Sequence, residues 1–196
     1  PVTVVGHSMG GQIALTLALA WPERVKALVL LAPAGIETFT KGEARWLKQV
    51  STVAAFKARD EQQLREHYKK NVFGKWTKDA EHHLEERVRV KRAADFDAYL
   101  HAVVASIHGM LDEHVADRLA SLQIPVTVVF GAQDGLIPNP ILHGDDPESV
   151  ADKARRLLPR AKVVVLPGLG HMLQVEDPAA INGLILEALA AAGAAE

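Results

Sequence analysis

The stretch PVTVVGHSMGGQIALTLALAWP, residues 1–22, decides the expected fold. Residues 2–5 form a short apolar run rich in valine, which is typical of a strand buried on both faces of a parallel sheet. Glycines on both sides of Ser8 allow the backbone to turn tightly there. Residues 12–20 are rich in Ala and Leu without alternation, which predicts a helix that is buried almost all round. The stretch therefore predicts a strand, a tight turn that holds one serine, and a helix.

The turn itself, GHSMG at residues 6–10, matches the G-x-S-x-G pattern of a nucleophile elbow. Such an elbow lifts the Ser8 hydroxyl clear of the sheet, and the backbone N–H of Met9 points at a developing oxyanion from the start of the helix. In the alternative interpretation, the serine only caps the helix. The nucleophile hypothesis demands more of the chain, because a serine hydroxyl also requires a base and an acid that orients the base.

Two further apolar stretches, each followed by a loop with a titratable side chain, meet that demand. Residues 126–130 predict a buried strand whose loop carries Asp134, and residues 163–166 predict another whose loop carries His171. Open α/β sheets hold their working residues beyond the carboxyl ends of the strands. The chain order Ser8, Asp134, His171 therefore predicts a catalytic triad.

This order and these strand ends resemble the α/β-hydrolase superfamily over essentially the whole chain. The resemblance implies that Ser8 is the nucleophile, Asp134 the acid, His171 the general base and the Met9 amide one oxyanion donor. Some members place the acid after the preceding strand, but here that strand ends in residues 32–35 without a carboxylate. The expected fold class is α/β, a parallel sheet with flanking helices that lacks its first strands and carries a helical lid insertion.

The insertion is expected at residues 36–120, between core portions at 1–35 and 121–196. It holds most of the lysines and arginines, and its apolar residues recur at helical spacing, with Thr77 as the predicted cap of one helix. Four or five such helices between two strands indicate a lid over the strand ends. The competing interpretation is that they pad the sheet or bind a partner protein.

Other acidic residues and histidines are assigned structural roles. Asp145 and Asp146 precede a predicted helix, so capping or solvation explains them. The adjacent His82 and His83 would face different directions on a helix and make a poor metal pair. Because the chain has no cysteine and no H-E-x-x-H spacing, we predict no metal and no cofactor. Four other histidines are assigned a structural hydrogen bond or a place in the core or lid, namely His7, His101, His108 and His114.

Composition narrows the classes of partner. The 196 residues carry a formal net charge of −2 and no basic stripe, which disfavours nucleic acid. The longest apolar stretch is too short to cross a membrane, and no signal-peptide pattern opens the chain, so we expect a cytoplasmic protein.

The expected reaction is hydrolysis of a small carboxylic ester, or a related carbonyl compound, that carries an apolar group. An acyl-enzyme would form on Ser8 and water would release it. One alternative is a carbon–carbon bond hydrolase of diketone-type ring-fission products, although such enzymes tend to place an aromatic residue where this chain has Met172. Acyl transfer to peroxide or to another alcohol remains open. An alternative of another class is a binding protein that retains the fold without activity.

The elbow strand is the first strand of the chain, and we expect a further strand to pair with it. The resemblance implies several strands before it, and an apolar parallel strand at an open edge leaves N–H and C=O groups unpaired. We therefore expect residues 2–5 to pair with a missing amino-terminal segment or with a second copy. A loop of that segment would also supply the second oxyanion donor, so this chain alone is expected to be weakly active or inactive.

Overall fold

The computed structural model describes residues 1–144 and 146–193, and its centre is a four-stranded parallel sheet in the order β1-β2-β3-β4. The register places Leu30 of β2 opposite Gly6 of β1 on one side and Val128 of β3 on the other. The sequence prediction of a parallel α/β sheet is confirmed. The strands are β1 (Val2–His7), β2 (Val25–Leu31), β3 (Val126–Gly131) and β4 (Lys162–Leu166).

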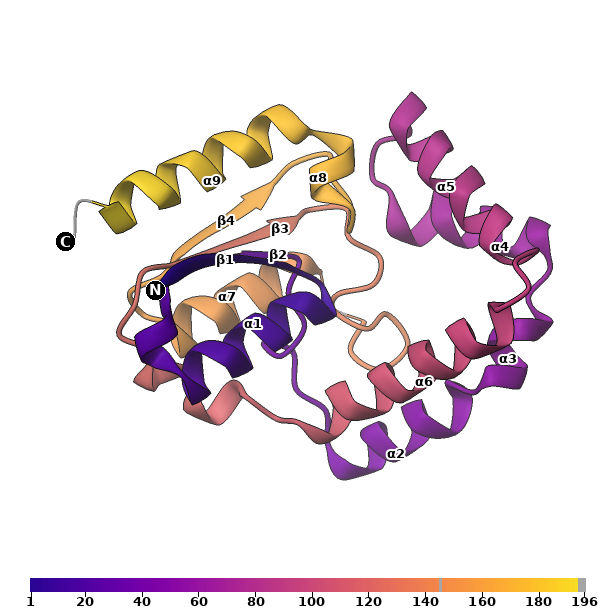
Figure 1. Ribbon diagram of the computed structural model, residues 1–196, viewed down its shortest axis with the longest axis horizontal. Coiled ribbons are helices and arrows are strands. Elements are labelled where there is room, and N and C mark those ends of the chain that lie inside the picture. The colour runs from indigo at the N-terminus through magenta and orange to yellow at the C-terminus, as the bar shows by residue number, and fades with distance from the viewer. Residues whose placement is uncertain (145, 194–196) are drawn as a thin grey trace.

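Helices cover both faces of this sheet (Figure 1). The helices α1 (Met9–Ala20) and α7 (Pro147–Leu157) pack on one face, and α9 (Pro178–Gly193) packs on the other. In β2, Leu28 and Leu30 belong to the core on the α1 and α7 side, whereas Val29 and Leu31 belong to the core under α9. This two-sided burial explains why the strand is an uninterrupted apolar run.

The inserted helices form a group beyond the carboxyl ends of the strands (Figure 1). Short polar residues begin several of them: the side chain of Thr77 accepts a hydrogen bond from the Ala80 amide, which confirms the predicted cap, and Thr40 and Asp60 cap other helices in the same way. The group comprises α2 (Lys41–Val50), α3 (Val53–Ala58), α4 (Glu61–His67), the π-helix η2 (Tyr68–Val72), α5 (Lys78–Val90) and α6 (Phe96–Asp112).

Both ends of the insertion merge with the core of the sheet. Ile36, Val115 and Leu119 are fully or almost fully buried in the cluster that lies on the α1 and α7 side. Leu119 belongs to a short 3₁₀-helix, η3 (Ala116–Ser121), that follows α6. Two other short elements, η1 (Pro22–Arg24) and α8 (Leu173–Glu176), connect α1 to β2 and β4 to α9.

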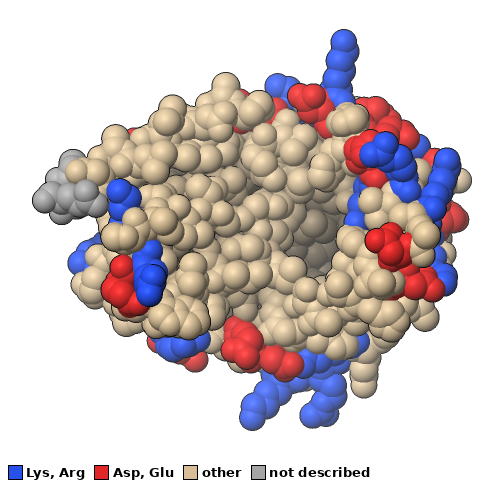
Figure 2. All heavy atoms as spheres, in the orientation of Figure 1, with Lys and Arg blue, Asp and Glu red and all other residues tan. Residues whose placement is uncertain are grey.

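The strand β1 lies at the edge of the sheet and, in the described structure, pairs with β2. Val2 and Val5 are 59% and 46% exposed, and the face over β1, α1 and α9 is largely uncharged (Figure 2). Its other exposed apolar side chains are Ile13, Trp21, Leu186 and Leu189. The pairing of β1 with a further strand stays a prediction. Among the described residues, no helix combines the length and apolarity needed to cross a membrane.

Candidate active site

Ser8 sits at the sharp turn between β1 and α1. Its φ of 54° lies in a region that side chains rarely adopt, and such a conformation costs about 1–3 kcal/mol that the surrounding structure must offset. The end of β2 holds this turn, because the Ser8 amide donates to the Leu31 carbonyl oxygen at 2.9 Å. The Ser8 side chain makes no capping hydrogen bond to α1, which leaves its hydroxyl available to the cavity beside it.

Two glycines of the elbow permit the close packing that sustains this turn. A Cβ atom at Gly6 would lie 2.5 Å from the Gly10 carbonyl oxygen, and one at Gly11 would lie 2.6 Å from the Pro33 Cβ. A Cβ at Gly10 would meet nothing within 4 Å. Close packing therefore requires glycine at positions 6 and 11 but not at position 10.

Asp134 follows β3 and is almost completely buried. Its Oδ1 accepts hydrogen bonds from the amides of Leu136 and Ile137 at 2.8 and 3.1 Å. Its Oδ2 lies 2.8 Å from Nδ1 of His171. The two amides fix the carboxylate, so that its second oxygen faces the imidazole.

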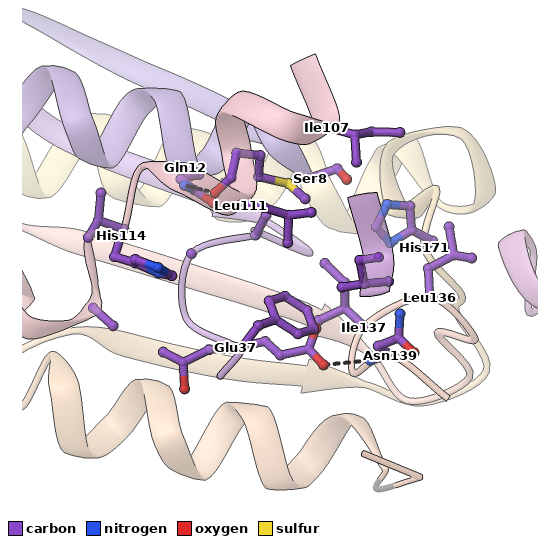
Figure 3. Close-up of a pocket in the computed structure, with 18 residues that line it drawn as sticks. Ser8, Gln12, Glu37, Ile107, Leu111, His114, Leu136, Ile137, Asn139 and His171 are labelled. Carbon is purple, nitrogen blue, oxygen red and sulfur yellow. Dashed lines mark hydrogen bonds between the residues drawn. The ribbon is translucent and has the colours of Figure 1, made fainter. Parts of the chain in front are cut away.

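His171 follows β4 and is 5% exposed. Its amide donates to the Val72 carbonyl oxygen at 2.8 Å, so the inserted segment helps to hold the loop. The hydrogen bond to Asp134 assigns the proton of the neutral ring to Nδ1 and leaves Nε2 as the basic atom. Figure 3 shows the Ser8 hydroxyl on the side of the cavity where the His171 ring lies.

His7, next to the serine, contacts the same loop. Its Nε2 lies 2.8 Å from the His171 carbonyl oxygen, and the two ring centroids are 4.8 Å apart. Burial is the main cause that lowers the pKa of His7 to about 4, and the electrostatic effect of His171 adds to it. His7 is therefore neutral near neutral pH and donates from Nε2, a structural hydrogen bond of the kind that the sequence suggested.

A segment of the insertion, residues 71–75, is bonded to the loops that carry Asp134 and His171. The Asn71 carbonyl oxygen accepts from the Gly135 amide at 3.0 Å. The buried carboxylate of Glu176 accepts from the amides of Gly74 at 2.9 Å and Gly170 at 3.0 Å. A Cβ at Gly170 would lie 2.3 Å from the Gly74 amide nitrogen. The insertion is thus built into the loops of the site and does not merely cover them.

The cavity beside Ser8 has a volume of about 260 Å³. Part of its apolar lining comes from the insertion, namely from Leu47 of α2 and from Ile107 and Leu111 of α6. The loop after β3 supplies Leu136 and Ile137. The volume lies below the range of about 300–1,000 Å³ that is common for drug-sized ligands, so the cavity suits a small organic molecule.

Several residues of the site escaped the sequence analysis. Glu37 and Asn139 line the cavity, although no motif marks them, and His114, which had been assigned to core or lid, also lines it. Glu176, to which no role was assigned from the sequence, is only 4% exposed. No local pattern distinguishes Glu37 and Glu176, because most of their hydrogen-bond partners are about a hundred residues away in the chain.

Two of the other acidic residues and histidines, Asp146 and His83, have local structural roles. Asp146 caps α7, where its Oδ1 accepts from the Ser149 amide at 3.1 Å, whereas Asp145 lies outside the described residues. His83 packs against the rings of Tyr68 and Phe73 in the insertion. Within residues 1–144 and 146–193, no cluster of three or more His, Cys, Asp or Glu side chains is arranged to hold a metal.

A parallel sheet with a strained serine turn and a buried Asp134–His171 pair at its strand ends defines an α/β protein of hydrolase type. The model of the alpha/beta hydrolase family matches residues 1–184. The chain therefore belongs to the alpha/beta hydrolase family.

Known proteins similar to this chain include enzymes of more than one activity. The chain is 30% identical, over 93% of its length, to the dihydrolipoyllysine-residue acetyltransferase component of the acetoin cleaving system of Pseudomonas putida, of which it covers 44%. It is 26% identical, over 93% of its length, to the pimeloyl-[acyl-carrier protein] methyl ester esterase of Yersinia enterocolitica, of which it covers 67%. The chain thus spans about half to two thirds of the length of these curated relatives.

A solved structure shares the fold. The crystal structure of a probable hydrolytic enzyme from Pseudomonas aeruginosa PAO1 is similar with a TM-score of 0.73 at 24% identity, over 96% of this chain and 63% of that one. At this identity the likeness shows the arrangement of the elements and not a shared substrate. The relatives include an esterase, so the family membership supports a hydrolase in general terms.

Proposed function

We propose that this protein is a serine hydrolase that cleaves a small carboxylic ester through an acyl-enzyme. The observation that carries the proposal is the 2.8 Å contact between His171 Nδ1 and Asp134 Oδ2 beside a cavity that Ser8 lines from a strained turn. A buried acid bonded to one nitrogen of an imidazole, with a serine near the other, is the arrangement that activates a hydroxyl. The esterase among the relatives supports the choice of an ester.

In the first half of the reaction, the Ser8 hydroxyl oxygen attacks the ester carbonyl carbon while His171 Nε2 takes the hydroxyl proton. The buried Asp134 carboxylate stabilises the imidazolium that forms. The Met9 amide belongs to the first residue of α1, whose N–H has no partner within the helix, and it donates to the tetrahedral oxyanion. The intermediate then collapses, and His171 returns the proton to the departing alkoxide, which leaves as the alcohol.

In the second half, water enters the cavity and gives a proton to His171 Nε2 as its oxygen attacks the acyl carbon. A second tetrahedral intermediate collapses to the free acid and regenerates the Ser8 hydroxyl with the same proton. The inserted helices act as a lid in this proposal, because apolar side chains from α2 and α6 line the cavity and exclude bulk water.

Substitution of the three proposed residues tests the mechanism. Ser8→Ala and His171→Ala should each lower kcat for a reactive ester by about 10⁴-fold or more, with losses that do not add in the double variant. Asp134→Asn should be the mildest of the three, because Ser8 and His171 both remain and another acceptor can still orient the imidazole. The exposed Ser121→Ala is the matched control. Undiminished turnover by a folded Ser8→Ala protein would show that another group is the nucleophile.

A fluorophosphonate probe separates an enzyme from a binding protein that only retains the fold, because an activated serine is required for labelling. Labelling should be confined to Ser8 and should vanish in His171→Ala. A panel of p-nitrophenyl esters, assayed beside a ring-fission dienoate, then compares ester cleavage with carbon–carbon cleavage. Faster turnover of the dienoate would replace the ester proposal with the carbon–carbon alternative.

A further inference from the structure

The cavity beside Ser8 has a polar end that the proposed chemistry does not use. Figure 3 shows Ser8 and His171 on one side of the cavity and Glu37 and Asn139 on the opposite side. Apolar side chains, among them Leu111, line the wall between the two sides. A substrate held with its carbonyl at Ser8 would therefore extend its far end toward Glu37.

The Glu37 carboxylate is held in place by one of its two oxygens. Its Oε1 accepts from the Asn139 amide at 2.6 Å and lies 2.5 Å from His143 Nδ1. The His143 ring stacks on Phe39 with centroids 5.4 Å apart, which fixes the donor in turn. The Glu37 side chain is only 9% exposed, and its hydrogen bonds with Asn139 and His143 both use Oε1. Glu37 lines the cavity, and neither of these hydrogen bonds occupies Oε2.

The charge at this end is not balanced by a cation of the cavity wall. Over the described part of the chain, the lining contains no lysine or arginine. Lys153 of α7 donates to the hydroxyl of the lining residue Thr38 at 2.5 Å. Burial lowers the pKa of Lys153, and the charge of Glu37 opposes this effect. His143 is the partner of Glu37, and its second ring nitrogen lies 3.8 Å from a carboxylate oxygen of Glu43.

We propose that Glu37 determines specificity: the site takes an ester whose chain ends, away from the ester group, in a hydroxyl or an ammonium that donates to Oε2. This inference rests on the proposed ester hydrolysis. A terminal methyl group would remove water from Oε2 without replacing its hydrogen bond. A terminal carboxylate would face a like charge in an enclosed space, which opposes binding. The proposal narrows the apolar ester expected from the sequence to one with a polar far end.

A matched series of substrates tests this assignment. The series contains methyl hexanoate, its terminal-hydroxyl and terminal-amino derivatives, and the monomethyl ester of adipic acid, so that chain length stays constant. In the wild type, kcat/KM for the amino and hydroxyl esters should exceed that for the adipate ester by about tenfold or more. Glu37→Gln should reduce the ratio of amino ester to adipate ester by about tenfold, whereas the exposed Glu148→Gln on α7 should leave it unchanged.

Binding separates this inference from the proposed reaction. Dissociation constants of the same uncleaved esters on Ser8→Ala protein, measured by calorimetry, should follow the same order. If wild type cleaves none of the esters, the proposed function fails, and the binding order on Ser8→Ala still decides the role of Glu37. A folded Glu37→Gln protein with unchanged selectivity would overturn the inference. So would a wild-type preference for the adipate ester, whether or not Glu37→Gln folds.

Discussion

At the residue scale, the strained backbone of Ser8 and the buried side chain of His7 are parts of the same turn. The positive φ of Ser8 is maintained because Gly6 and Gly11 let the first turn of α1 and the end of β2 approach the elbow closely. His7, one residue earlier, bonds to the His171 carbonyl oxygen. The turn that exposes the serine therefore also carries a side chain that holds the loop of the proposed base.

His7 should make stability depend on pH. Burial lowers its pKa from 6.5 to about 4, so between these values the unfolded chain binds more protons than the folded chain. The contribution of neutral His7 to the free energy of unfolding is fully present above pH 6.5. It is lost as pH falls through this window, and the free energy of unfolding decreases by up to about 3 kcal/mol. His7→Gln keeps an N–H donor but cannot take up this proton.

Urea unfolding of both proteins at pH of about 7 and about 4.5 measures this effect. The free energy of unfolding should fall more steeply with acid in the wild type than in His7→Gln. Burial also lowers the pKa values of His67 and His83, but these residues are present in both proteins and cancel in the comparison. Parallel pH profiles would exclude a buried neutral His7.

At the element scale, α8 joins the insertion to the loop of His171. Its residue Glu176 accepts hydrogen bonds from the amides of Gly74, Lys75 and Gly170, and two of these donors lie about a hundred residues earlier in the chain. A buried carboxylate whose oxygens are satisfied by backbone amides holds two segments together without a cation. The short helix α8 thus orients residues 71–75 and the loop after β4 relative to each other.

Glu176→Gln should loosen that junction. The amide nitrogen of glutamine would face backbone donors, so we expect the free energy of unfolding to fall by about 2–3 kcal/mol. Hydrogen exchange should accelerate at residues 71–75 and 168–172 more than in the sheet. The control is Glu187→Gln, which removes an exposed pair with Lys162 and should change stability by less than about 1 kcal/mol. Equal protection of both segments in the two variants would contradict this role of Glu176.

At the scale of the whole molecule, the cavity exists because two separate parts of the chain meet over the strand ends. The sheet supplies Ser8, His171 and the loop after β3, and the insertion supplies walls from α2 and α6. Neither part encloses the space alone. Chain-length preference should therefore depend on the insertion, even though the strands form no ladder hydrogen bonds with it.

Ile107→Trp tests whether the insertion sets the chain-length preference. The larger side chain projects from α6 into a cavity of about 260 Å³, so kcat/KM for a hexanoyl ester should fall by about tenfold or more relative to that for an acetyl ester. Ala105→Trp places the same ring on an exposed position of α6 and is the matched control. An unchanged ratio in Ile107→Trp would show that α6 does not limit the acyl chain. A similar melting temperature in both variants confirms that the fold is retained.

Local sequence patterns were sufficient to predict the parallel α/β sheet, the elbow around Ser8 and the order of Asp134 and His171 along the chain. These features depend on local patterns, namely apolar runs, glycine spacing and side chains directly after strands, which parallel pairing then brings to one edge. Only the tertiary structure shows the surroundings of Glu37 and Glu176. A charged side chain in a helix or loop has the same local pattern whether it faces solvent or a cavity. Its burial depends on amides and rings that packing supplies from about a hundred residues away.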